Sequence, residues 1–189
     1  MKIEFAALAA VAALISLDGH AGAFATIGAG AADWPDCGSG AVSCDRREGA
    51  WFARAGVGIP LVPFLGVEAR YANLGRSSYG TQVLQSPPVT QDVTVESKGA
   101  GVGAVLQVPI PLDLTLSGVA GLMRMKTSAT LLGFSGSLTK TNPYYGVGID
   151  YRLNNSKFSV GAEATRYRVD FGVKDNVDTY TVSFTFRFL

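Results

Sequence analysis

The chain has 189 residues, enough for one domain with a sizeable core, and 48% of them are hydrophobic. That fraction excludes a highly charged disordered chain, and a formal net charge of +1 gives no reason to expect a nucleic-acid partner. Beyond the first 20 residues, no apolar run reaches the roughly 18–20 residues that a membrane-spanning helix needs. Such a chain can cross a bilayer only as a closed β-barrel, whose strands satisfy one another's backbone hydrogen bonds.

The N-terminal segment has the order of a secretory signal peptide. Lys2 supplies a positive charge, residues 5–17 are apolar, and Ala21-Gly22-Ala23 is a small-residue cleavage site. Ala23-Phe24-Ala25 fits the same pattern two residues later, and an uncleaved anchor is the alternative to cleavage. We expect a signal peptide over residues 1–23 and a single barrel domain over residues 24–189.

The two cysteines, Cys37 and Cys44, lie in a segment rich in Gly, Ser and Asp. An exported protein meets an oxidising environment, which favours a disulfide between them. A loop this short stabilises the fold by about 2–3 kcal/mol in the chain-entropy model. The alternative is a metal or redox pair, but no third thiol is present, and the only histidine, His20, leaves with the signal peptide.

Stretches of alternating apolar and polar residues follow the signal peptide and indicate half-buried strands. In the last of them, Phe184, Phe186 and Phe188 share one face while Thr185 and Arg187 share the other. We expect eight strands near residues 24–32, 50–59, 64–73, 93–108, 112–127, 142–153, 157–168 and 178–188.

The predicted connections alternate in length. Tight turns are expected at residues 60–63, 109–111 and 154–156, and long loops near residues 33–49, 74–92, 128–141 and 169–177. Short turns at one end and long loops at the other are typical of bacterial outer-membrane barrels. The fold class is therefore predicted to be all-β, an eight-stranded antiparallel up-and-down transmembrane β-barrel.

Charged residues fall on one face of the predicted strands, and apolar residues such as Val67, Val102 and Val147 on the other. A charge that faces hydrocarbon at mid-membrane costs about 2–4 kcal/mol, so the charged face must point inward. Buried charges need partners, and we expect an ion-pair network that fills the lumen. Its predicted members are Arg54, Glu68, Arg70, Asp150, Arg152, Glu163 and Arg187.

From about residue 24 to residue 188 the chain resembles the OmpA/OmpX-like outer membrane β-barrel family, which includes opacity-type surface antigens. The matching stretches are residues 56–59, 66–71, 98–103 and 184–188. The resemblance covers the barrel alone, without a peptidoglycan-binding domain. It implies localisation in the cell outer membrane of a Gram-negative bacterium. It also implies that Phe184, Phe186 and Phe188 form a C-terminal signal for the barrel-assembly machinery, although here Leu189 follows the final aromatic residue.

The favoured function is a non-enzymatic surface or structural protein, of the adhesin or envelope-integrity type, with no cofactor and no metal. Loops on a rigid scaffold are where binding usually resides, so an extracellular or host ligand would bind there. Outer-membrane lipids and lipopolysaccharide are the other expected partners. Arg166 and Arg168, at the outer end of the seventh predicted strand, are candidate contacts for lipopolysaccharide phosphates.

Three other functions are alternatives. A small-solute porin is the main alternative, but eight strands enclose too little space for an aqueous channel unless the lumen is empty. An outer-membrane hydrolase resembling known barrel enzymes would need a histidine base, which the mature chain lacks, although Glu68 and Glu163 offer a carboxylate pair. A soluble lipocalin-like barrel would place its apolar face inside.

Overall fold

The computed structural model describes residues 22–35, 41–45, 47–59, 62, 64–83, 89–131, 134–154, 156–170 and 174–188. The strands of this part are β1 (Ala23–Asp33), β2 (Ala41–Asp45), β3 (Arg47–Gly58), β4 (Leu65–Val83), β5 (Val89–Ile110), β6 (Leu114–Leu131), β7 (Phe134–Arg152), β8 (Phe158–Asp170) and β9 (Lys174–Phe188). Within the described residues, no helix has the length and apolarity needed to span a membrane.

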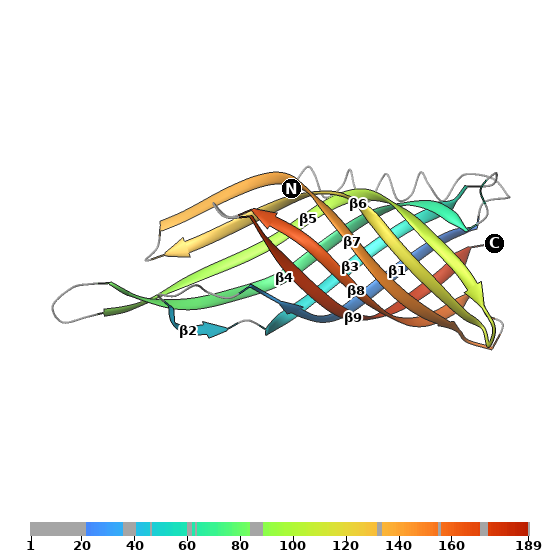
Figure 1. The fold of residues 1–189 in the computed structure, drawn as a ribbon, viewed down its shortest axis with the longest axis horizontal. Coiled ribbons are helices and arrows are strands. Elements are labelled where there is room, and N and C mark those ends of the chain that lie inside the picture. The colour runs from blue at the N-terminus through green and yellow to red at the C-terminus, as the bar shows by residue number, and fades with distance from the viewer. Residues whose placement is uncertain are drawn as a thin grey trace.

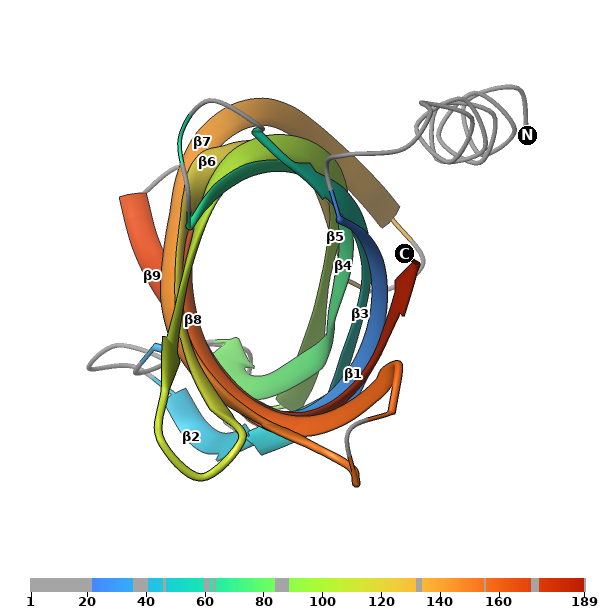
Figure 2. The same cartoon turned by 90° about the vertical axis from the view of Figure 1, so that its right-hand side faces the viewer.

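Eight of the strands form one closed antiparallel ring, as predicted (Figure 2). Each pairs with its neighbours in the chain, and β9 pairs with β1 to close the barrel. β2 stands outside the ring and pairs only with the outer part of β4. The eight-stranded up-and-down barrel is therefore confirmed, and β2 is an addition that the sequence did not predict.

The register of the barrel shows how strongly its strands are tilted. We start at Arg47 in β3 and step from each residue to its partner on the next strand, through β1, β9, β8, β7, β6, β5 and β4. The path returns to β3 at Val57 and not at Arg47, so the strands are staggered by ten residues round the ring. An eight-stranded barrel with a stagger of this size has tilted strands and an interior just wide enough to be filled by side chains.

Two predicted loops are largely strand. β4 continues to Val83 and β5 begins at Val89, so the prediction of a loop at residues 74–92 is wrong. The prediction of a loop at residues 128–141 is also wrong, because β6 continues to Leu131 and β7 begins at Phe134. Both hairpins project beyond the ring (Figure 1). Their polar composition suggested loops because a hairpin that leaves the barrel has no apolar medium on either side.

The other long connections are also shorter than predicted. β8 continues to Asp170 and β9 begins at Lys174, within the loop expected at residues 169–177.

In β4, a bulge between Asn73 and Arg76 places Gly75 at a φ of 74°, a left-handed conformation that glycine adopts without strain. This bulge lets β4 continue outward beside β5.

At the short-turn end, the reversal between β5 and β6 lies later than predicted. Pro109 and Ile110 remain in β5, paired with Thr115 and Leu114, and the turn occupies residues 111–113. Leu112 and Asp113 adopt left-handed φ values of 70° and 58°. That conformation reverses the chain in two residues, which the prolines do not do.

The outer surface of the ring is an apolar band, as the alternation predicted. Large side chains that a soluble protein would bury are exposed here, with Val147 at 67%, Val102 at 66% and Ile27 at 64%. Aromatic residues line both edges of the band: Trp51, Tyr71, Tyr145 and Tyr180 towards the hairpin end, and Tyr151, Phe158, Phe186 and Phe188 towards the short turns. A continuous apolar belt with aromatic edges suits a bilayer, and it argues against a soluble lipocalin-like barrel.

Replacing Val147 with Arg tests which face meets lipid. The charge would lie in the middle of the band, and we expect the free energy of unfolding, measured by urea titration in lipid vesicles, to fall by about 2–4 kcal/mol. Ser135→Arg, on the same face of β7 but in the projecting hairpin, where it lies opposite Thr130, is the matched control and should have little effect. Equal stability of the two variants would contradict the assignment.

Candidate functional site

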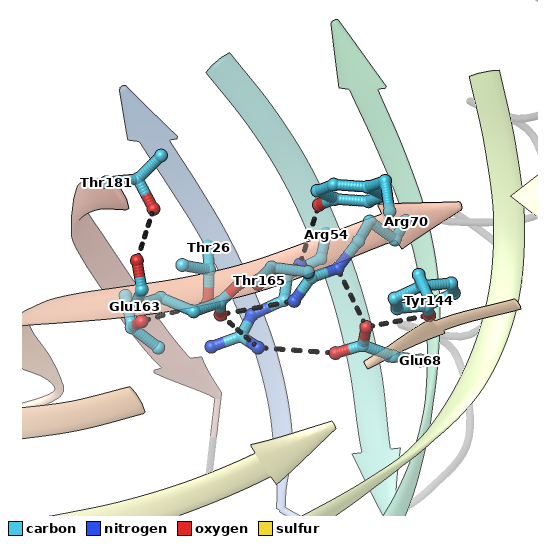
Figure 3. Close-up of polar contacts among 10 residues, drawn as sticks. Thr26, Arg54, Glu68, Arg70, Tyr144, Glu163, Thr165 and Thr181 are labelled. Carbon is cyan, nitrogen blue, oxygen red and sulfur yellow. Dashed lines mark hydrogen bonds and ion pairs between the residues drawn. The ribbon is translucent and has the colours of Figure 1, made fainter. Parts of the chain in front are cut away.

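Four charged side chains meet inside the barrel (Figure 3). Arg54 projects from β3, Glu68 and Arg70 from β4, and Glu163 from β8, and none is more than 5% exposed. Glu68 and Arg70 share the inward face because they are two residues apart on one strand. β8 lies four strands from β4 in either direction round the ring, so contacts between them cross the full width of the lumen.

These side chains form a closed set of ion pairs. Arg54 Nη1 lies 2.9 Å from Glu163 Oε2 and 3.4 Å from Glu68 Oε2. Arg70 Nε donates to Glu68 Oε1 at 2.9 Å, and its Nη1 and Nη2 donate to the two carboxylate oxygens of Glu163 at 2.6 and 3.2 Å. Each arginine thus contacts both glutamates, and the four charges cancel. We call this set the central ion-pair ring.

Hydroxyl groups occupy further acceptor positions on the two carboxylates. Tyr144 donates its hydroxyl hydrogen to Glu68 Oε1 at 3.1 Å, and Thr165 Oγ1 donates to Glu163 Oε1 at 2.6 Å. A buried carboxylate has several lone pairs, and each unfilled one adds to the cost of removing it from water. The neighbouring hydroxyls therefore lower the cost of keeping both glutamates ionised inside the barrel.

Aromatic rings enclose the Arg70 guanidinium. Its carbon lies 4.8 Å from the centre of the Phe52 ring and 5.4 Å from that of Tyr144, distances at which a cation is attracted to a ring face. Arg70 Nη1 also donates to the Tyr167 hydroxyl at 3.1 Å, and the rings of Tyr144 and Tyr167 are stacked 5.9 Å apart. Arg70 is held on several sides at once.

Glycines on the facing strands make room for Tyr144. A Cβ atom on Gly103 would lie 2.5 Å from the Tyr144 hydroxyl oxygen, and one on Gly121 would lie 2.7 Å from a ring carbon. Both distances are too short for any side chain. At these two positions glycine therefore accommodates an aromatic ring that itself contacts Glu68.

Between the central ion-pair ring and the hairpin end, most of the buried side chains are apolar, although Ser97 and Thr127 are also buried there and form a hydrogen bond of 3.0 Å with each other. This outer apolar cluster is made of inward side chains from every strand of the ring: Ala32, Trp34, Ala50, Phe52, Ala72, Leu74, Val93, Val95, Val119, Met123, Met125, Tyr144, Tyr167, Val169 and Val177. Trp34, just beyond β1, donates from Nε1 to the Leu74 carbonyl at 3.1 Å. The buried indole is thereby tied to the opposite edge of the cluster.

The expectation that charges alone fill the lumen is therefore wrong for the hairpin half. Every second residue of a strand points to the same face, so Ala72 and Leu74 point inward like Glu68 and Arg70 on β4. On β6, Met123 and Met125 point inward like Gly121 for the same reason. The signal was present in the sequence. The inward apolar residues of the hairpin half were not predicted, because apolar residues were placed on the lipid face.

The other predicted network members lie towards the short turns. Asp150 is buried, whereas Arg152 and Arg187 are partly buried, and no ion pair joins these three to one another in the described part of the chain. Arg187 donates instead to Ser159 Oγ. One carboxylate oxygen of Asp150 and the Nε of Arg54 have no hydrogen-bond partner among the described residues. The structure thus brings four of the seven predicted residues together.

The predicted disulfide lies outside the described residues, because Cys37 is not described and only the backbone of Cys44 is, in β2. Phe184, Phe186 and Phe188 lie on β9, and the Phe158 ring of β8 is 5.4 Å from that of Phe184 and 5.0 Å from that of Phe186. Their role as an assembly signal stays a prediction. No cluster of three metal-binding side chains occurs among the residues described.

Comparison with protein families finds a match to the outer membrane protein beta-barrel domain over residues 5–188. Similar solved structures include Ail, the attachment invasion locus protein of Yersinia pestis, at 18% identity and a TM-score of 0.58, covering 90% of this chain and 100% of that one. The same protein has been solved with the heparin analogue sucrose octasulfate.

Two further structures share the fold. Neisserial surface protein A matches at 16% identity and a TM-score of 0.57, covering 90% of this chain and 98% of that one. OprG from Pseudomonas aeruginosa matches at 13% identity and a TM-score of 0.51, covering 89% and 93%. No curated protein matches the sequence.

Removing one glutamate tests the energetic role of the central ion-pair ring. Glu163→Ala leaves Arg54 and Arg70 without their shared partner, and we expect the free energy of unfolding in lipid to fall by about 3–5 kcal/mol. Glu96→Ala removes a partly exposed glutamate paired with Lys98 and should cost less than about 1 kcal/mol. Equal urea midpoints for the two variants would show that the ring contributes little.

Proposed function

The chain belongs to the outer membrane protein β-barrel domain family and resides in the outer membrane of a Gram-negative bacterium, and from this we propose that it is a non-enzymatic scaffold with a plugged lumen. In this proposal its function is carried by the parts that project from the cell, as an adhesin or as a protein that maintains the envelope. Assembly by the barrel-assembly machinery, guided by the aromatic residues of β9, is part of the same proposal.

The observation that carries the plugged lumen is the central ion-pair ring. It joins β4 to β8 across the whole width of an interior that has room for side chains only. Above it lies the outer apolar cluster, most of whose side chains offer water and ions no hydrogen bonds. A hydrated solute would have to break buried ion pairs and then cross this apolar section, and each step opposes passage.

The same contacts support a non-enzymatic role. Glu68 and Glu163 are the carboxylates that a hydrolytic mechanism would need, and both are bound by Arg54 and Arg70 in the interior. A general acid or base must reach its substrate, and these carboxylates are at most 5% exposed. These contacts favour a structural role for Glu68 and Glu163 over a catalytic one.

The projecting hairpins support a surface role. In β7, residues 135–141 are exposed on both faces, and β8 pairs with β7 only from Tyr144 onward. This stretch therefore extends from the cell surface with one edge unpaired. Ail, which has the same fold, has been solved with a sulfated heparin analogue. That complex makes heparin a reasonable first probe for an adhesin-type function of this chain.

A small-solute porin is the alternative, and the two functions differ in permeability. We expect vesicles that contain the folded protein to show no flux of small sugars and no stable conductance, because the lumen is filled. A double variant, Arg70→Ala with Glu163→Ala, should open the central section and admit solute. Heat-modifiable migration on gels would confirm that each barrel is folded.

Glu96→Ala with Lys98→Ala, which removes an ion pair on the outside of the barrel, is the matched control and should remain silent. Reproducible flux through the unmodified protein would reject the plugged scaffold. In that case the partly buried Asp150, Arg152 and Arg187 would be the residues to test for ion selectivity.

Trimming one hairpin tests the surface role. Ser128 of β6 lies opposite Ser137 of β7, so an Asn-Gly turn in place of residues 129–136 closes the hairpin early without disturbing the ring. For an adhesin, we expect cells that display this variant to lose attachment to immobilised heparin. Replacing residues 81–91 in the β4–β5 hairpin, between Gly80 and Asp92, is the matched control.

For an envelope-integrity protein the result differs. Deletion of the whole protein would then sensitise cells to detergent, while both trimmed variants would restore resistance. Unchanged attachment in both variants, together with normal detergent resistance in the deletion strain, would reject both forms of the proposal.

A further inference from the structure

The outer edge of the apolar band carries its charges unevenly. On β5 and β6, the outward residues Val102 and Leu122 are 66% and 57% exposed. Towards the hairpin end, the next outward residues on β6 are Arg124 and Lys126, and on β5 Ala100 is followed by Lys98. Lys98 lies directly opposite Lys126 in the register, and Arg124, opposite Ala100, is the diagonal neighbour of Lys98. Opposed side chains on one face of a strand pair lie about 4.5–5.5 Å apart at Cβ, where like charges destabilise.

Only one acid compensates for this group in the described part of the chain. Glu96 lies 3.3 Å from Lys98 Nζ and 4.0 Å from a guanidinium nitrogen of Arg76 on β4. Arg124 and Lys126 are exposed and form no ion pair with any described residue. We call Arg76, Lys98, Arg124 and Lys126 the basic rim cluster. With Glu96 it has three positive charges in excess.

The opposite side of the same edge has a smaller excess of positive charge, because four of its charged residues balance and one further cation, Arg168, is exposed on β8. Arg47, Asp33, Asp178 and Arg166 follow one another across β3, β1, β9 and β8 as direct cross-strand neighbours, two positive and two negative. Arg166 donates from Nε and Nη2 to the two carboxylate oxygens of Asp178, both at 2.6 Å. Arg166 and Arg168 were predicted contacts for lipopolysaccharide phosphate. Two donors of Arg166 are engaged by Asp178, whereas Arg168 lies opposite Asn176 and forms no ion pair with a described residue.

We propose that the basic rim cluster binds the phosphates of lipid A, the membrane anchor of lipopolysaccharide, in the outer leaflet. Uncompensated cations this close together require an anion, and Arg and Lys pair strongly with phosphate oxygens. The apolar surface of Val102 and Leu122 lies directly beneath, so the bound anion is one that carries acyl chains. This site lies on the outer face of the strands, at the base of the two projecting hairpins and away from the lumen, and it does not depend on the proposed function.

The test compares two double variants of the full-length protein that lose the same charge. Arg124→Gln with Lys126→Gln removes the two unpaired cations of the cluster. Arg47→Gln with Lys157→Gln removes two exposed cations elsewhere, one on the opposite side and one at a short turn. Binding is measured in detergent micelles with diphosphorylated lipid A, with dephosphorylated lipid A and with inorganic phosphate as competitor.

We expect the cluster variant to bind diphosphorylated lipid A about 25-fold more weakly, roughly fivefold for each charge removed, and the control to bind normally. Affinity for dephosphorylated lipid A should be weak and equal in all three proteins. Arg124→Lys with Lys126→Arg should restore binding. Equal losses in both double variants, no loss in either, or displacement by millimolar inorganic phosphate would each overturn the proposal. Unchanged heat-modifiable migration shows that the variants fold.

Discussion

Charge inside this barrel is tolerated because it is closed on itself. Arg54, Arg70, Glu68 and Glu163 form a set in which each cation contacts both anions, with no net charge left over. A single unpaired charge in such an interior would cost several kcal/mol, so removing one member leaves a worse arrangement than removing all four. Because the set joins β4 to β8, strands four places apart in the ring, it constrains the whole barrel.

The rest of the interior is arranged around this constraint. Tyr144, Thr165 and Tyr167 direct their hydroxyl groups at the charged set, and Gly103 and Gly121 leave the space that the Tyr144 ring occupies. Towards the hairpin end most buried side chains are apolar, and towards the short turns they are mainly polar. The interior therefore has three sections along the axis, each of different chemistry, and a solute would have to meet all of them in turn.

On the outer surface, side chains need no partner within the protein, because the surrounding lipid can contact both its apolar and its charged groups. Lipid covers the apolar band, and Arg47, Asp33, Asp178 and Arg166, on β3, β1, β9 and β8, balance one another. The basic rim cluster on β4, β5 and β6 is the exception, with more cations than the described chain can neutralise. Inside the barrel an excess of this kind would be destabilising, whereas at the edge of a phosphate-bearing leaflet it becomes a means of attachment.

The sequence by itself determined the ring of eight strands, the inward parity of its charged residues and the apolar face towards lipid, because a period of two residues is a local property of a strand. Three features depended on the tertiary structure. Which charges pair is set by the stagger of the barrel, which brings Glu163 to Arg54 and Arg70 but forms no ion pair among Asp150, Arg152 and Arg187 in the described part of the chain. The hairpins were mistaken for loops because strands in water on both sides lose the apolar alternation. Arg166 and Arg124 look alike in the sequence, and only the cross-strand register places an aspartate beside the first and a lysine near the second.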